Sequence, residues 1–520
     1  MASPVAMTNL KVLHNVPLDN TYSDTLYFAS LGAQTTYFLG KVKYSYTNCT
    51  YQRVNSSVAS PRIAYSMRVP EVADKLYDCN YVMFQNTGFG SKWFYGFIRQ
   101  VNYINPNNTE IIYELDDYQT WAFDIQIRPS YIEREHSISD DLYENLEPEP
   151  VEIGDYACLS FTSKIYHEFK IIIAVSTTPQ NSPVSGEILD HVYSGVQFNE
   201  FSNASSANSF ISSYVTEGKL DSIISIFMTP FTFASNVEDE IEISRPTSLN
   251  GYTPRNKKLL SYPYCFIEVA EGGGNKNEYY FENFTQYDLP PITVFPAKFK
   301  IYKNRGFNPS MCIVPFSYRG NNLQNVDFSQ NIQIGNFPVC GWTGNVFANW
   351  YAQNHMGLNL NLFTNLFSSV TSLFAGNLTS SVQQGIDGVG SYLSEMNSRS
   401  KNRGQLQGSA ANPSIMFSAD RVGFVLRTMA LRPENAQRID EFFDMFGYTT
   451  NRLKMPNLTG RESWNYVKTR DIIIDGSIPV TAMATIKAMF NRGVRFWHGD
   501  YVGDYSRSNK CIKEVNADEK

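Results

Sequence analysis

The stretch NYVMFQNTGFGSKWFYGFI, residues 80–98, is the clearest indication that this chain has a β fold. Tyr81–Phe84 and Trp93–Ile98 are rich in aromatic and aliphatic side chains, which favour extended strands. Between them, Thr87–Gly90 carries two glycines and is typical of a turn. We therefore predict a β-hairpin with its turn near residues 87–91.

The segments on either side extend the same β pattern over about residues 10–135. Thr36–Leu39 and Lys43–Tyr46 are short and aromatic, and we expect both to be strands. Val101–Leu115 contains a second hairpin signal, because two apolar runs flank the turn-prone Asn105–Asn108. Strands at this spacing predict a sandwich or a barrel.

The rest of the chain mixes both kinds of element. The acidic, proline-bearing stretch 133–155 is interpreted as a connection between domains, and a helix is expected near residues 205–218. Pro433–Phe446 and Ile478–Phe490 have helical spacing, and Gly447 ends the first of them. The fold class is therefore α+β, mostly β, with several domains. The expected divisions are 1–150 (β), 151–335 (β-rich), 336–355 (helical connector), 356–416 (apolar loop) and 417–520 (α+β).

Composition excludes several classes of protein. The 520 residues carry a net charge of −7, and charged residues make up only 18%, with 14% aromatic residues. Such a chain is neither disordered nor a coiled coil, and it lacks the basic character of a dedicated nucleic-acid reader. The seven cysteines form no C-x-x-C pair, which predicts free thiols made in a reducing cytoplasm and no zinc site. The N-terminus lacks the pattern of a secretion signal, and no long uninterrupted apolar run predicts a permanent transmembrane helix.

No motif points to catalysis. The nucleophile elbow, the phosphate-binding loop and the H-E-x-x-H zinc motif are all absent from the sequence. Asp116 and Asp117 are adjacent, so we interpret them as surface or hydrogen-bonded residues rather than a catalytic pair. Glu133, Glu135 and His136 are interpreted as a charged strand end or a salt-bridge cluster and not as metal ligands. We expect a protein that is not an enzyme and that holds no cofactor or metal.

Met356–Leu393 is the most unusual stretch, because Asp387 is its only ionisable charge at pH 7. Its apolar residues recur at steps of three or four, which is helical spacing, while five glycines destabilise a helix in water. One interpretation is a pair of buried helices, and the other is a membrane-active segment that is sheltered until it is released. The candidate residues are Leu358, Leu362, Phe363, Leu366, Phe367, Val370, Leu373, Phe374, Leu378, Val382, Ile386, Val389 and Leu393.

Several segments, in order along the chain, resemble the tail knob family, the distal tail tube proteins of small short-tailed phages with protein-primed genomes (Salasmaviridae and Rountreeviridae). The resembling segments are Asn80–Asn86, Lys92–Tyr95, Glu114–Asp124, Glu133–His136, Asn336–Trp342, Asn349–Asn354, Gly447–Tyr448, Lys454–Asn457 and Phe490–Gly499. They span roughly residues 10–136 and 335–500, whereas residues 150–330 show little likeness.

The resemblance implies a virion protein of the tail tip, in which β-barrel or sandwich tube domains assemble into a hexameric ring or tube. It also implies an apolar loop, here about Met356–Met416, that plugs the lumen and perforates the host membrane during genome ejection. The implied partners are further copies of the chain, a lower collar or upper tail tube protein, a cell-wall-degrading protein of the tail tip, the host membrane, and genomic DNA that passes without sequence-specific binding.

Two other hypotheses stay open at this stage. The aromatic, β-rich surface also fits a receptor-binding or adhesion module of the tail that contacts cell-wall carbohydrate. A cell-wall hydrolase is disfavoured, because the catalytic motifs are missing.

Overall fold

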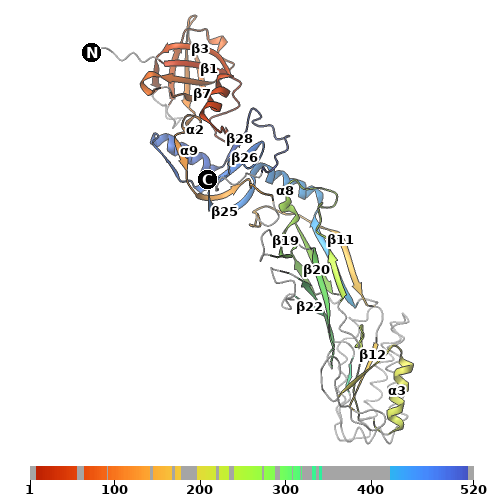
Figure 1. Ribbon diagram of the computed structural model, residues 1–520. Coiled ribbons are helices and arrows are strands. Elements are labelled where there is room, and N and C mark those ends of the chain that lie inside the picture. Colours follow the sequence, from red (N-terminus) through yellow and green to blue (C-terminus); the bar gives the residue numbers. More distant parts are fainter. Residues whose placement is uncertain are drawn as a thin grey trace, which may run out of the picture. The chain divides into compact units, whose positions relative to one another are not determined.

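The computed structural model describes most of the chain outside residues 342–421. The described ranges are residues 8–54, 64–90, 92–140, 145–166, 170–176, 196–217, 219, 222–233, 239–271, 275–286, 293–294, 296–306, 309–316, 318, 331–334, 339–341 and 422–512. They are mostly β, as expected, and form two compact units (Figure 1). Unit 1 comprises Met1–Ile153, Thr253–Leu259 and Glu434–Lys520, and unit 2 comprises Gly154–Tyr252 and Leu260–Pro433.

Unit 1 begins with a seven-stranded antiparallel sheet. Its order is β3 (Val42–Cys49), β1 (Thr8–His14), β6 (Cys79–Asn86), β7 (Phe94–Asn105), β8 (Asn108–Leu115), β5 (Ala64–Val69) and β4 (Tyr51–Val54). The two predicted hairpins are confirmed, because β6 pairs with β7 and β7 pairs with β8. The sheet curls, since β3 at one edge approaches β5 next to the other edge. Buried side chains such as Val12, Met67 and Tyr113 fill its inner face.

The prediction of a strand at Thr36–Leu39 is wrong, because these residues lie in helix α1 (Leu31–Leu39). The Ser30 hydroxyl accepts a hydrogen bond from the Ala33 N–H and caps the first turn. Gln34 and Phe38, one helical turn apart, are the buried residues of α1. The aromatic composition of this segment therefore reflects burial of one helix face and not a pleated strand.

A second sheet of unit 1 combines strands from distant parts of the sequence. Its order is β2 (Asp24–Leu26), β28 (Val494–Trp497), β26 (Trp464–Asp471), β10 (Ser130–Glu135) and β25 (Tyr448–Lys454), and β9 (Ile125–Ile127) pairs separately with β27 (Ile474–Gly476). Unit 1 also contains helices α2 (Asp117–Trp121), α8 (Pro433–Phe446) and α9 (Val480–Arg492). Helix α9 packs against β26, and α2 packs against α9 and β7. Glu133 and Glu135, expected in a connection between domains, instead lie in β10 with a strand on either side.

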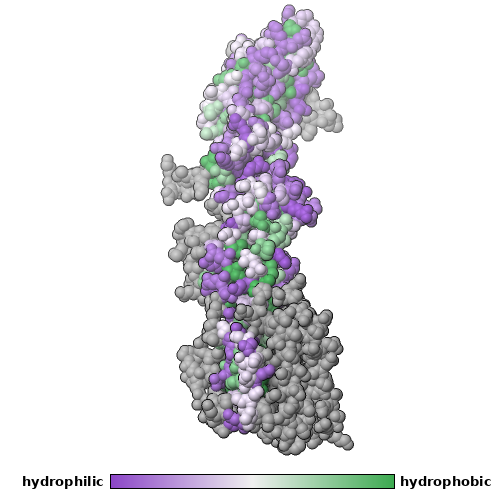
Figure 2. Space-filling model, turned by 90° about the vertical axis from the view of Figure 1, so that its right-hand side faces the viewer, coloured by the Kyte–Doolittle hydropathy of each residue, from purple (hydrophilic) through white to green (hydrophobic). Residues whose placement is uncertain are grey.

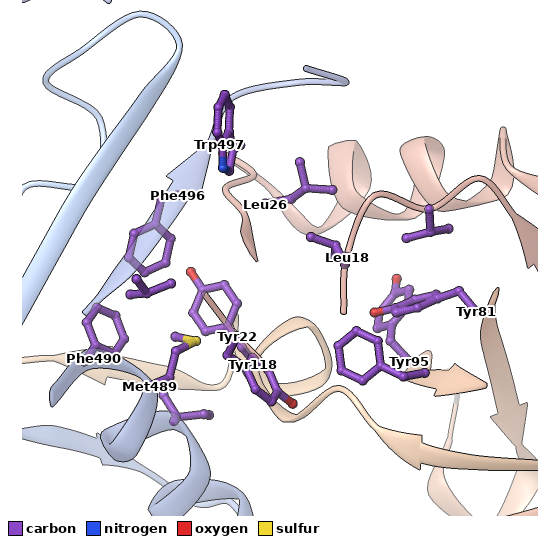
Figure 3. Close-up of a cluster of buried hydrophobic side chains, with 14 of the residues drawn as sticks. Leu18, Tyr22, Leu26, Tyr81, Tyr95, Tyr118, Met489, Phe490, Phe496 and Trp497 are labelled. Carbon is purple, nitrogen blue, oxygen red and sulfur yellow. The ribbon is translucent and has the colours of Figure 1, made fainter. Parts of the chain in front are cut away.

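One aromatic core joins the N-terminal and C-terminal parts of unit 1 (Figure 3). Phe38 stacks on Tyr81 with ring centroids 5.3 Å apart, and Tyr118 meets Phe496 edge-on at 5.5 Å. Trp464 and Trp497 are buried in the same core, with their ring centroids 4.8 Å apart. Large aromatic side chains supply much buried apolar area each, so this core holds the two sequence halves together.

Unit 2 contains three four-stranded sheets and one α-helix among its described residues. The first sheet has the order β11 (Tyr156–Ile165), β24 (Gly423–Leu431), β16 (Cys265–Glu271) and β17 (Lys276–Tyr279). The second has the order β13 (Gln197–Phe201), β12 (Lys170–Val175), β14 (Ile223–Thr229) and β23 (Val339–Gly341), and the third β15 (Asp239–Ile243), β20 (Ala297–Asn304), β21 (Ser310–Phe316) and β22 (Ile332–Ile334). A short pair joins β18 (Thr285–Gln286) and β19 (Thr293–Val294). Helix α3 (Ala204–Thr216), predicted near residues 205–218, packs against β12 and β13.

The described surface carries no single continuous apolar face in the view of Figure 2, where hydrophobic side chains form separate patches among hydrophilic ones. The six cysteines whose side chains are described are free thiols, which agrees with the expectation from their spacing. Among the described residues, no helix is both long enough and apolar enough to cross a membrane.

Candidate functional site

The resembling segments Glu133–His136, Gly447–Tyr448 and Lys454–Asn457 meet in unit 1 around a group of hydrogen-bonded polar side chains. We call this group the polar cluster. Its members, most of them fully buried, are Glu135, His136, Asp140, Asn256, Asp440, Asp444, Tyr448, Asn457 and Arg461. Buried polar groups are tolerated only when they are hydrogen-bonded, so their partners decide what the cluster can do.

Helix α8 presents Asp440 and Asp444 on its buried face, one helical turn apart. One Asp440 carboxylate oxygen accepts hydrogen bonds from the backbone N–H (3.0 Å) and the side-chain amide (2.7 Å) of Asn256. The other oxygen accepts from the Arg255 N–H at 2.7 Å. Asp444 pairs with the Arg255 guanidinium at 2.6 Å, and burial raises the pKa of the Asp444 carboxyl.

Asn256 and Arg461 connect these acids to the rest of unit 1. Asn256 belongs to Thr253–Leu259, which is part of unit 1 although the chain on both sides belongs to unit 2. The Arg461 guanidinium donates to the Asn256 side-chain oxygen at 2.9 Å and to the Asn509 carbonyl at 3.0 Å. The Tyr448 hydroxyl donates to Asp140 at 2.6 Å. Hydrogen bonds with Asp440 and Arg461 therefore hold the segment Thr253–Leu259 in unit 1.

His136 and Glu135 complete the cluster at the end of β10. The Nδ1 atom of His136 accepts from the Tyr466 N–H at 2.9 Å, so Nε2 carries the proton and donates to the Asp444 carbonyl at 2.9 Å. Burial, followed by the positive charge of Arg461, holds the pKa of His136 well below its usual value. Glu135 contacts the Lys454 ammonium and accepts from the Asn457 N–H at 2.9 Å. Burial nevertheless raises the pKa of Glu135.

A second buried network involves two of the same strands, since Arg134 lies in β10 and Thr449 in β25. The Glu149 side chain is fully enclosed and contacts the Arg134 guanidinium and the Lys258 ammonium. It also accepts hydrogen bonds from the N–H (2.9 Å) and the hydroxyl (2.8 Å) of Thr449. Burial alone would raise the pKa of Glu149, but Lys258 and Arg134 hold it below its usual value. The second Glu-Pro pair of the acidic stretch is therefore an anchor of the fold.

The resembling segment Glu114–Asp124 forms a separate buried network. Asp116 caps helix α2 by accepting from the Gln119 N–H at 3.0 Å, and its other oxygen accepts from the Tyr81 hydroxyl at 2.8 Å. The Gln119 amide donates to the Leu26 carbonyl, and the Gln34 amide donates to Gln119. Asp116 is thus hydrogen-bonded, as predicted, and the N–H and O–H donors around it compensate the cost of burying its carboxylate.

The chemistry of the polar cluster is structural. The carboxylates of the polar cluster are satisfied by donors of their own chain, which leaves no general base or nucleophile of this cluster facing a substrate. Glu133 pairs with Lys468 at 2.8 Å and Glu135 with Lys454, which confirms the predicted salt bridges for the two glutamates, whereas His136 is buried and hydrogen-bonded. Within the described ranges, no group of three or more potential metal ligands is assembled. His498 packs against Tyr27, and burial lowers its pKa.

Sequence reasoning missed Asn256, Asp440, Arg461 and Glu149. One signal was available for Asp440, because it lies four residues after Ala436 and three before Phe443, and this spacing places it on the apolar face of the helix. Asn256 and Arg461 carry no comparable local signal. The candidate plug residues, from Leu358 to Leu393, all lie outside the described residues, as do Asn349–Asn354.

Two family models match this chain. Residues 231–510 match the model described as Bacillus phage phi29, tail knob protein gp9, C-terminal domain, and residues 6–126 match the caudoviral major tail protein N-terminus. The chain is 25% identical to the tail knob protein gp9 of Bacillus phage B103, over 98% of this chain and 99% of that protein. It is 24% identical to the tail knob protein gp9 of Bacillus phage phi29 over the same shares.

A solved structure has a similar fold. The tail knob protein gp12 of bacteriophage C1 matches with a TM-score of 0.56 at 14% identity, and the match covers 95% of this chain and 97% of that one. The chain therefore shares its fold with a solved tail knob protein.

Proposed function

This chain belongs to the phage tail knob family, whose C-terminal domain model covers more than half of its length, and we propose that it forms a tube that conducts the genome and opens the host membrane. As a tail knob protein it is a structural component of the virion tail of a short-tailed phage. The finer parts of the proposal are a hexameric ring, a lumen for DNA, and a plug built from the apolar loop 356–416.

The observation that carries the proposal is the composition of Met356–Leu393. Apolar side chains at helical spacing, many small polar residues and one ionisable charge suit a segment that partitions into a bilayer as helix. Exposed in the virion, such a segment would aggregate. We therefore place it in the lumen, where the other copies of the chain shelter it until host contact or DNA pressure releases it.

The net negative charge of the chain supports a tube through which DNA passes without being bound by the wall. A net charge of −7 per chain, repeated around a ring, makes the assembly strongly anionic. A wall of the same sign as the phosphate backbone repels DNA and does not hold it. We propose that the tube joins a lower collar or upper tail tube protein on one side and a cell-wall-degrading protein at the tip. We propose residues 151–335 as a β-rich domain and residues 417–520 as an α+β domain of this tube protein.

Paired substitutions in the loop test the membrane role. Leu362→Asn with Leu366→Asn places amides on the proposed apolar face, whereas Thr364→Asn with Ser368→Asn, each two residues further along, changes residues that are already polar. We expect the first pair to reduce dye release from liposomes at least about tenfold, because each exchange opposes insertion by about a kcal/mol or more. The second pair should leave dye release close to that of the unchanged protein.

Ring integrity is measured beside leakage by negative-stain electron microscopy. A deletion of residues 358–404 should leave six-fold rings and abolish dye release. Undiminished leakage from the deletion variant refutes the membrane role. Monomers at assembly concentrations refute the ring, and tight binding of cell-wall carbohydrate by those monomers would favour the adhesion hypothesis.

A further inference from the structure

Strand β11 is an edge strand that the described part of unit 2 leaves open. It pairs with β24 along nine register positions, from Tyr156 to Ile165. Among the described residues no strand pairs with its other side, since β11 is the outermost strand of its sheet. An open edge presents a row of N–H and C=O groups that can bind another extended chain.

The middle of β11 is exposed on both of its faces. The four residues Ser160–Ser163 are all exposed, although successive side chains of a strand point to opposite sides. Phe161 is 72% exposed, the largest exposed fraction of any aromatic side chain in the described residues. The adjacent strand differs, because Leu426, the register partner of Thr162, is fully buried.

The exposed run carries none of the usual protection of an edge. Natural edges are blunted by charges, prolines or bulges, and here the register shift at Cys158/Ser160 precedes the run. The one charge that follows, Lys164, is paired with Asp239 at 3.3 Å. A long, uncharged edge with an exposed phenylalanine is a hazard for aggregation unless a partner covers it.

We propose that β11 is the surface on which a second copy of this chain docks, by adding an edge strand to the sheet β11-β24-β16-β17. The inference rests on the proposed ring, because that assembly supplies another copy at every edge. The run Ser160–Ser163 is neutral, which disfavours DNA or an anionic membrane as the occupant. Backbone pairing by a like chain requires no charge.

The order of strands supports a head-to-tail contact. Every pairing in the sheet is antiparallel, and the sheet has four strands, so its far edge β17 runs opposite to β11. A β17 strand from the next copy would therefore continue the antiparallel order against β11. A contact between two different patches of one chain repeats around a ring when the rotation closes. Phe161 would supply the buried aromatic anchor of that contact.

Cys158 on β11 is a native reporter of this contact. Its thiol is exposed in the single chain, whereas Cys49, Cys79 and Cys265 are buried. We expect a maleimide reagent to modify Cys158 at least about tenfold more slowly in assembled rings than in dissociated chains, as quantified by peptide mass spectrometry. Equal rates in rings and in free chains would refute docking at β11 while leaving the ring itself intact.

A charged substitution provides the second test. Phe161→Lys should raise the dissociation constant of the assembly at least about tenfold, measured by native mass spectrometry or sedimentation. Val480→Lys, at an exposed aliphatic residue (85%) of unit 1, is the control and should assemble normally. Normal assembly of Phe161→Lys, or equal loss in both variants, overturns the assignment. If the unchanged protein forms no rings, the proposed function itself fails.

Discussion

Replacement of Asp440 by asparagine should destabilise unit 1 strongly although it exchanges a single side-chain oxygen for an amide nitrogen. Asp440 is fully buried and accepts three hydrogen bonds, two from Asn256 and one from the Arg255 N–H. An asparagine has one acceptor oxygen, so its amide nitrogen must face one of these donors. In the Asp440→Asn protein, two hydrogen-bond donors therefore face each other at a fully buried side chain: the new side-chain NH2 group and an N–H of Arg255 or Asn256.

The magnitude follows from the hydrogen bonds that the substitution removes or weakens. A hydrogen bond to a charged acceptor contributes about 1.5–3 kcal/mol, and a buried donor without a partner costs about 1–3 kcal/mol. One bond is removed and two become neutral, so we expect the free energy of unfolding of unit 1 to fall by about 2–4 kcal/mol. Glu441→Gln removes the same charge from the exposed side of the same helix and should change it by less than about 0.5 kcal/mol.

Urea unfolding followed by tryptophan fluorescence measures the effect. Trp464 and Trp497 lie in the core of unit 1 and report its unfolding directly. Circular dichroism should show unchanged strand content at low denaturant for both variants. If Asp440→Asn and Glu441→Gln shift the transition equally, the polar cluster does not stabilise unit 1 and the argument from buried hydrogen bonds is wrong.

Two further predictions concern the same unit. Gly447→Ala should destabilise unit 1 by more than about 3 kcal/mol, because its φ is +65° and a Cβ atom would overlap the Glu135 carbonyl. Gly503→Ala is the control and should cost about 1 kcal/mol, because its φ is +87° but the space around it is open. Equal shifts of the thermal unfolding temperature in the two variants would contradict this prediction. Glu149 has a lowered pKa, so the stability it contributes is full above the unfolded value of about 4.3 and is lost as pH falls through the folded pKa. The difference between the unchanged protein and Glu149→Gln should therefore shrink below about pH 4 in urea titrations, and a difference independent of pH would rule out the ion pair as its cause.

Local patterns predicted the elements whose partners are close in sequence. The hairpin of β6 and β7 and the turn at Asn105–Asn108 depend on a few consecutive residues, and both are confirmed. Helix α8 was identified for the same reason, since Pro433 begins it and Gly447 follows its last residue. Thr36–Leu39 was assigned wrongly, because aromatic side chains on a buried helix face resemble those of a strand when read over four residues.

The candidate site was only partly accessible from sequence. Glu133–His136 and Gly447–Tyr448 were recognised as resembling a family, but their meeting depends on the pairing of β10 with β25, more than 300 residues apart. Asn256 and Asp440 are separated by 184 residues and carry no pattern that links them. Such pairs become visible only when the chain is folded.

Residue types and short spacings in the chain were enough to predict the mostly β character, the free thiols, the absence of catalytic motifs and the nearly uncharged stretch Met356–Leu393. Three features became visible only in the folded chain: the acidic stretch supplies a buried anchor in Glu149, Thr253–Leu259 belongs to unit 1, and β11 has an edge left open by the described strands. Burial and strand pairing depend on residues far apart in the chain, and local composition does not encode those long-range contacts.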